Sequence, residues 1–148
     1  MVIEPVIAFY TNHFFSETTK GMLNKIWDIM NEDHPDLVEI AAPLDIISKV
    51  KLIETLIRDI NDEIKVQHIE IPKSLELSIQ QLNDIIDRIH KNLNNIKNGI
   101  EYHKTLWFSS FRSIGYLEEV EKLKKNNSIL DTRLDHLIKI IMLFRNKK

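Results

Sequence analysis

Apolar residues recur at three- and four-residue steps along most of this chain, which is the spacing of one face of an α-helix. The most regular run predicts a long helix from Ser74, its expected N-terminal cap, to a stop at Asn98-Gly99. Its apolar positions are Ile79, Leu82, Ile85, Ile86, Ile89, Leu93, Ile96 and Ile100. This spacing is typical of the packing seam of an antiparallel helical bundle.

Three other segments show the same periodicity and predict helices over about residues 5–31, 43–64 and 116–145. Gly21 interrupts the first pattern, so that segment could also be two helices that meet near this glycine. The first helix should end before His34-Pro35, because a residue that precedes proline is pushed out of the helical backbone region.

The connections between these helices are predicted from their local patterns. Residues 36–42 form a lead-in to the second helix, and residues 65–72 are expected to be a loop. Residues 101–115 concentrate four aromatic side chains, which predicts a short helix or ordered loop that caps the bundle. The span from Tyr102 to Phe111 could be core or an exposed binding hot spot, and clustering favours core. Residues 126–128 are a point where the last helix could kink or divide.

These helices predict an all-α fold, an antiparallel four-helix bundle with one or two additional short helices. The composition agrees, because three glycines and four prolines are too few for the turns of an all-β chain. Hydrophobic residues make up 43% and charged residues 28%, the balance of an ordinary globular domain. No repeat or linker divides the chain, so we expect one domain over residues 1–148.

The residues provide little for catalysis or metal binding. The absence of cysteine excludes disulfides, zinc–thiolate sites and cysteine nucleophiles. The Asp87–His90 pair and the neighbouring Asp135 and His136 could ligate a metal, but we expect them to be solvated surface residues. No phosphate-binding glycine loop, nucleophile elbow or kinase signature occurs. We therefore expect a protein that is not an enzyme and needs no cofactor, with an enzyme of unrecognised site as an alternative.

Charge is distributed unevenly. Residues 1–74 carry 7 Lys/Arg and 13 Asp/Glu, a charge of −6, whereas residues 75–148 carry 13 and 9, a charge of +4. The two halves could be two differently decorated surfaces, or the basic half could meet anionic lipid or an acidic partner. The pI of 6.3 argues against nucleic-acid binding. Candidate lipid- or partner-binding residues are Lys122, Lys124, Lys125, Arg145, Lys147 and Lys148.

The C-terminal segment "IKIIMLFRNKK" is apolar nearly all round and ends in basic residues. Such a segment could be a helix end buried on several sides, or it could face lipid or a partner. No secretory signal occurs, nor a run of about 18 uncharged apolar residues. We therefore expect a cytoplasmic protein, with recruitment to membranes if the C-terminal segment faces lipid.

The order of the helices, the aromatic connection and the final run "YLEEVEKLKKNNSILDTRLDHLIKII" resemble the HeLo-type four-helix bundles. This family includes the N-terminal domain of the MLKL necroptosis effectors and the helical domain of some plant resistance proteins. The resemblance extends from about Ile26 to Phe144. It implies a bundle that oligomerises when an upstream regulatory protein or domain triggers it, then binds anionic phospholipid and disrupts the membrane. No family lipid contact is carried over, and the acidic first half departs from a strongly basic bundle.

Two functions follow as hypotheses. The first is a non-enzymatic signalling bundle that resembles cell-death effector domains and acts on anionic membranes. The alternative is a helical adaptor, inhibitor or viral accessory protein that binds a protein partner without membrane activity. The first hypothesis rests on the resemblance and the apolar, basic C-terminal end. The alternative rests on the lack of catalytic motifs together with the uneven charge.

Overall fold

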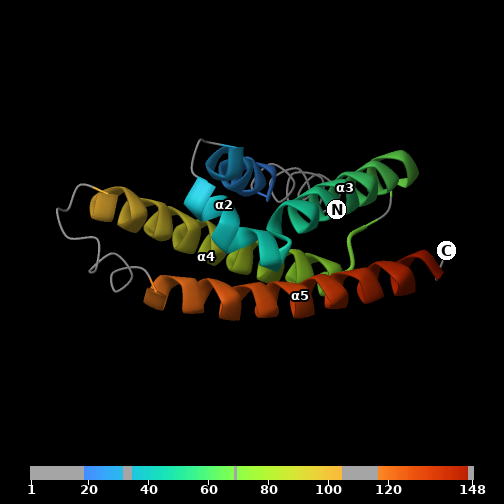
Figure 1. Cartoon of the computed structure of the whole chain (residues 1–148). Helices are drawn as coiled ribbons and strands as arrows, with labels where there is room; N and C mark the ends of the chain where they lie inside the picture. The colour runs from blue at the N-terminus through green and yellow to red at the C-terminus, as the bar shows by residue number, and fades with distance from the viewer. Residues whose placement is uncertain (1–18, 32–34, 69, 105–116, 147–148) are drawn as a thin grey trace.

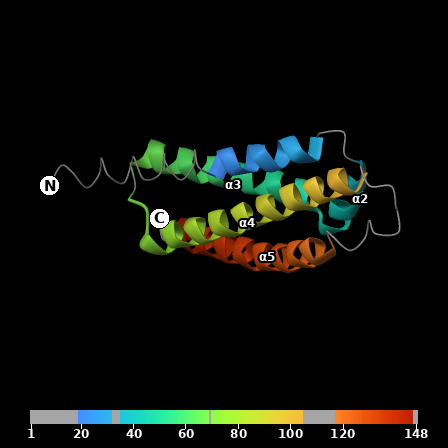
Figure 2. The ribbon, with the colours of Figure 1, turned by 90° about the vertical axis from the view of Figure 1, so that its left-hand side faces the viewer.

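A computed structural model describes residues 19–31, 35–68, 70–104 and 117–146, and every element in these ranges is helical. The prediction of an all-α helical bundle is confirmed. A helix over residues 19–31 is followed by the short α2 (Pro35–Ala41) and the 3₁₀ turn η1 (Ala42–Leu44). The long helices α3 (Ile46–Gln67), α4 (Lys73–Lys104) and α5 (Leu117–Asn146) complete the bundle. Each long helix runs antiparallel to the preceding one (Figures 1 and 2).

Helix α4 lies at the centre of the core. All eight apolar positions predicted for its buried face are buried, at 0–7% exposure, as is Leu75. Helix α5 packs along α4 over its length, and its buried residues follow alternating steps of four and three: Leu123, Asn127, Leu130, Leu134, Leu137 and Ile141. This is the spacing of a helix whose seam faces one partner. Each fully buried Leu or Ile contributes about 1.5–3 kcal/mol by removal from water.

The helix over residues 19–31 packs on the other side of the core, beside α3 (Figure 2). Two polar contacts fix its position. The Thr19 hydroxyl donates a buried hydrogen bond to Oδ1 of Asn83 on α4. The Lys51 ammonium of α3 lies 5.3 Å from the centre of the Trp27 ring. A cation at this distance is attracted by the face of the ring.

The second helix begins three residues later than the predicted start at Pro43, because Asp45 breaks the helical run. Asp45 has φ 55°, in the left-handed region. Its backbone N–H donates to the Ala42 carbonyl at 3.1 Å, which ends η1, and its carbonyl accepts from Lys49 N–H at 3.2 Å, which starts α3. The predicted lead-in over residues 36–42 is confirmed, since α2 occupies most of it.

The connection between α3 and α4 is shorter than the predicted loop over residues 65–72. Helix α3 continues to Gln67 and is closed by His68, whose φ is 51° and whose N–H donates to the Ile64 carbonyl. Helix α4 begins at Lys73, so Ser74 is not the cap. The Pro72 carbonyl accepts from the N–H groups of Leu75 and Glu76, both at 3.1 Å, and opens the helix.

Two expected interruptions are absent. Helix α4 passes through Asn98-Gly99 and continues to Lys104, because Ile96 and Ile100 on either side are buried in the core. A glycine costs a helix about 1 kcal/mol relative to alanine, which burial of two isoleucines outweighs. Helix α5 is continuous through residues 126–128, where Asn127 is buried against α3. The predicted helical segment at residues 5–18 and the aromatic residues after Tyr102 lie outside the described residues.

Candidate interaction surface at one end of the bundle

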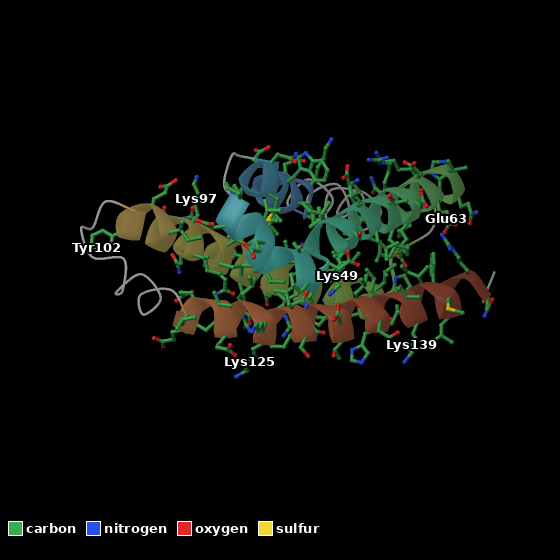
Figure 3. The ribbon with its side chains drawn as sticks, viewed as in Figure 1. Lys49, Glu63, Lys97, Tyr102, Lys125 and Lys139 are labelled. Carbon is green, nitrogen blue, oxygen red and sulfur yellow. The ribbon has the colours of Figure 1, made fainter. Side chains whose placement is uncertain are left out.

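The basic residues predicted at the start of the last helix are largely balanced by neighbouring acids. Lys122 lies 3.8 Å from Glu118 and 3.3 Å from Glu119, and Lys124 lies 3.4 Å from Glu121. Lys125 is exposed and projects from α5 away from the other helices (Figure 3). Lys122, Lys124 and Lys125 therefore form a surface of mixed charge, and most of their positive charge is compensated locally.

The structure does not bring the two predicted basic clusters together. Arg145 follows Lys125 by twenty residues on the same helix, a separation of about 30 Å along its axis. Arg145 instead faces α3, where its Nε donates to both carboxylate oxygens of Glu63 at 3.1 and 3.4 Å. Figure 3 labels Glu63 near the end of α3, close to the last turns of α5. Lys147 and Lys148 lie outside the described residues.

An open groove of about 400 Å³ lies beside this ion pair, between the ends of α3 and α5. Its lining comprises Asp59, Asp62, Glu63, Val66, Gln67 and Arg145. Asp59, Asp62, Glu63 and Val66 follow one another at steps of three and one along α3, so they share one face of that helix. We call the three carboxylates and Val66 the acidic stripe.

The acidic stripe carries more negative charge than its surroundings neutralise. Within the described part of the chain, Asp59 and Asp62 form no ion pair, and Glu63 is paired with Arg145. Arg58, the base next to Asp59 along the helix, is directed at Glu54 instead, with Nη2 at 2.8 Å from Oε1. The groove therefore presents a net negative surface with one guanidinium at its edge.

Exposed apolar side chains gather at the same end of the bundle. The described residues include eight large apolar side chains that are exposed, and four of them lie where α3 ends, α4 begins and α5 ends. These are Val66 at 78% exposure, Leu143 at 61%, Met142 at 57% and Leu77 at 45%. Figures 1 and 2 both place these three helix ends at the same end of the bundle. We call this region the α3–α5 end.

The C-terminal segment is buried on one side and exposed on the other. Ile141 is buried and Ile138, Ile140 and Phe144 are partly buried against the core, whereas Met142 and Leu143 face outward. Sequence reasoning missed Val66, because residues 65–72 were interpreted as a loop, whereas the three carboxylates of the acidic stripe lie within the helix predicted over residues 43–64. The signal was present in the sequence: Val66 lies off the face that buries Ile57, Ile60 and Ile64, so a longer helix exposes it.

A small second cavity of about 130 Å³ lies between the start of the 19–31 helix and α3. Its lining comprises Thr19, Lys20, Leu23, Glu54, Ile57, Arg58 and Asn61. Arg58 and Glu54 pair with each other at its rim. The cavity is too small for a drug-sized ligand, for which pockets of about 300–1,000 Å³ are usual.

In both histidine–carboxylate pairs the carboxylate lies against a lysine. Asp87 lies 3.0 Å from Lys91 rather than bonding His90. Burial lowers the pKa of His90, and Lys25 and Lys91 lower it further, against the opposing effect of Asp87. His136 is exposed, and its neighbour Asp135 pairs with Lys139 at 2.9 Å. No group of three potential metal ligands occurs among the described residues.

The polar residues inside the bundle bond to one another. Asn126 donates to Asn92 at 2.6 Å, and Asn92 donates to Glu119 at 3.1 Å, so a partly buried hydrogen-bonded chain joins α4 and α5. Asn95 adds a longer bond of 3.4 Å to Glu119. Because these groups satisfy each other, they serve register and helix pairing rather than ligand binding.

Fold and surfaces together define a helical bundle whose exposed apolar and acidic residues meet at the α3–α5 end. No protein-family model matches the chain, and no solved structure matches it. It is similar to the uncharacterized protein L717 of Acanthamoeba polyphaga mimivirus, with 26% identity over 147 aligned residues. The alignment takes in 84% of this chain and 71% of the viral protein. Over the described residues, no helix has the length and apolar character needed to cross a membrane.

Proposed function

We propose that this chain is a non-enzymatic helical interaction module that binds a protein partner at the α3–α5 end. The observation that carries the proposal is that Val66, Leu77, Met142 and Leu143 are all exposed at the end of the bundle where α3 ends, α4 begins and α5 ends. Single exposed apolar residues are ordinary on a protein surface, but a group of them marks a surface that another molecule covers.

The charge at the α3–α5 end favours a protein partner over an anionic lipid surface. Asp59 and Asp62 are exposed and form no ion pair among the described residues, so they would repel lipid phosphates at the same face. Lys122 and Lys124 at the start of α5 are paired with acids of their own helix, and they lie about 30 Å from Arg145 along the helix axis. A membrane-binding surface would concentrate unpaired positive charge on one face.

A membrane-acting signalling bundle, as the resemblance to cell-death effectors implies, is the second candidate function. One observation favours it: Met142 and Leu143 are exposed directly before Arg145, and the sequence continues with Lys147 and Lys148. Apolar residues beside basic ones suit the boundary between headgroups and acyl chains. On this proposal the chain is recruited from the cytoplasm and oligomerises at the membrane.

The protein-partner proposal is tested by site-directed photo-crosslinking. A photoreactive phenylalanine derivative replaces Val66 or Leu143, and a control places it at the polar, exposed Lys125. Because the similar viral protein comes from Acanthamoeba polyphaga mimivirus, an extract of Acanthamoeba polyphaga is the first source of partners. We expect a protein adduct from positions 66 and 143 and none from position 125.

The adduct alone does not establish the function, so the captured protein is then purified and mixed with the chain. We expect a stoichiometric complex by sedimentation that Val66→Ser and Leu143→Ser each weaken. In parallel, dye release from liposomes with and without anionic lipid is measured at low and high salt. Salt-sensitive leakage that requires anionic lipid, without any protein complex, would replace the first proposal with the second.

A further inference from the structure

We infer that the partner segment that binds at the α3–α5 end is a basic, amphipathic stretch of a different protein. In the unbound chain, Arg145 occupies the position that a basic side chain of this segment takes in the complex. This inference rests on the proposed function and assigns the chemistry of the partner.

Charge complementarity indicates which charged side chains the partner segment carries. The groove between α3 and α5 is lined by three carboxylates and one guanidinium, so it keeps a net negative charge. Asp59 and Asp62 are left without an ion pair among the described residues. Lysine or arginine side chains of a partner would complete the pairs that the described residues do not provide.

The arrangement of the acidic stripe disfavours α3 itself, which indicates a use outside the helix. Asp59 precedes Asp62 by three residues and Glu63 by four, so carboxylates face one another along the helix and repel. Arg58 does not relieve them, since it is directed at Glu54. A like-charge arrangement of this kind, in which Glu63 gains an ion pair with Arg145 but Asp59 and Asp62 gain none among the described residues, is expected where a site binds a ligand.

The exposed apolar side chains of this chain indicate that the partner segment also carries apolar residues. Val66 continues the acidic stripe and is the most exposed of the large apolar residues described. Small polycations would pair with the carboxylates and leave Val66, which lines the groove, in water. A segment with apolar residues on one face and basic residues beside them covers both kinds of surface, as an amphipathic helix does in a groove.

Arg145 shows that the groove accepts a guanidinium. Its Nε reaches both oxygens of Glu63, at 3.1 and 3.4 Å, from the last turn of α5. A basic side chain of the partner would compete for the same carboxylate. Removal of Arg145 should therefore strengthen binding, whereas removal of the carboxylates should weaken it.

The test uses full-length chain and a synthetic 14-residue peptide with Leu and Lys placed on opposite faces of a helix. Binding is measured by fluorescence anisotropy. The Asp59→Asn/Asp62→Asn variant should bind about fivefold more weakly, the effect of two exposed charge pairs. Arg145→Ala should bind more tightly, and Val66→Ser more weakly. The control Asp28→Asn/Glu39→Gln removes the same charge from exposed positions elsewhere and should bind as the unaltered chain does.

Two further peptides separate charge from apolar contact. A peptide with Glu in place of Lys should not bind, and one with Ser in place of Leu should bind only weakly. Equal losses in the Asp59→Asn/Asp62→Asn variant and the Asp28→Asn/Glu39→Gln control would overturn the inference, because binding would then follow overall charge. Circular dichroism of every variant verifies that the bundle is folded.

The outcomes also separate this inference from the proposed function. If crosslinking at position 66 captures a protein whose contact segment is acidic or uncharged, the basic-partner inference is wrong and the interaction module stands. If the chain binds only liposomes or forms a dimer through this end, both are overturned. A captured partner whose contact segment is basic and amphipathic, with a complex that Arg145→Ala tightens, would support both.

Discussion

Lys49 on α3 donates a hydrogen bond of 2.9 Å to Oδ1 of Asn127, a residue only 8% exposed on the seam of α5. The same ammonium lies 2.7 Å from Asp131, one turn further along α5. Figure 3 shows the Lys49 side chain directed from α3 toward α5. The contact places a charge-assisted pair at a position that an apolar residue would otherwise fill.

Replacing Lys49 with methionine should therefore destabilise the bundle by about 1–3 kcal/mol, because the buried amide of Asn127 loses its partner. The double variant Lys49→Met/Asn127→Leu should recover most of this loss, since a well-packed apolar pair is often as stable as a buried polar one. Both are measured by urea unfolding. Lys139→Met, at an exposed ion pair on α5, is the control and should change stability by less than about 1 kcal/mol. A double variant no more stable than Lys49→Met would contradict this account.

Glu119 should make the stability of the bundle depend on acid pH. Burial raises the pKa of Glu119, but hydrogen bonds from Asn92, Asn95 and Lys122 lower it more, so the pKa in the folded chain lies below the ordinary 4.5. The charged form is therefore favoured by folding. Its contribution is present above pH 4.5 and is lost as the pH falls through the folded pKa.

The measurement is the free energy of unfolding of the unaltered chain and of Glu119→Gln from about pH 6 to about pH 3. The two should differ most at the higher pH and converge as Glu119 becomes protonated. Glu121→Gln, at an exposed position on the same helix, is the matched control. A stability difference between unaltered chain and Glu119→Gln that does not change with pH would exclude the carboxylate as its source.

His90 should make the stability of the bundle depend on pH in a higher pH range than Glu119 does. Burial and the nearby Lys25 and Lys91 lower its pKa below 6.5 despite Asp87. The folded chain therefore holds His90 neutral where the unfolded chain binds a proton, so stability should fall as the pH drops below 6.5. His90→Gln should remove this part of the pH dependence, whereas substitution of the exposed His136 should leave it intact. Thermal unfolding between about pH 7.5 and about pH 5.5 makes the comparison.

Gly21 should tolerate a side chain with a gain in stability. It lies within the 19–31 helix at an exposed position, and a Cβ atom built there meets nothing within 4 Å. Alanine lowers the entropy of the unfolded chain and favours the helix, so Gly21→Ala should stabilise by about 0.5–1 kcal/mol. Asn24→Ala, exposed on the same helix, should give a smaller gain. Destabilisation by Gly21→Ala in urea unfolding would show that this segment is not helical in solution.

The helical fold could be predicted because burial and periodicity agree. Every apolar position of the predicted face of α4 is buried, since a 32-residue helix with a continuous apolar face needs a partner along its whole length. Helix ends were less predictable. Ser74 and Gly99 have strong local preferences for a cap and a stop, but the Pro72 carbonyl and the burial of Ile100 override them.

The candidate site was predicted only in part. The local run of basic residues indicated Arg145, but its partner Glu63 is 82 positions away, and no local pattern relates the two. The lysines at the start of α5 were grouped with Arg145 by charge, although a straight helix holds them far apart. Only Val66 of the acidic stripe depends on α3 continuing to Gln67, so an error of three residues at one helix end removed this apolar position from the prediction.

The polar bonds of α5 also determine how this helix can move. Lys49 bonds it near its middle, Asn92 and Asn95 near its start, and Glu63 near its end. A slide of α5 by one turn, about 5.4 Å, would part all of these pairs together. These bonds therefore oppose a gradual shift of α5 along its axis relative to its neighbours. Helix α5 is either held in this single register or released along its whole length.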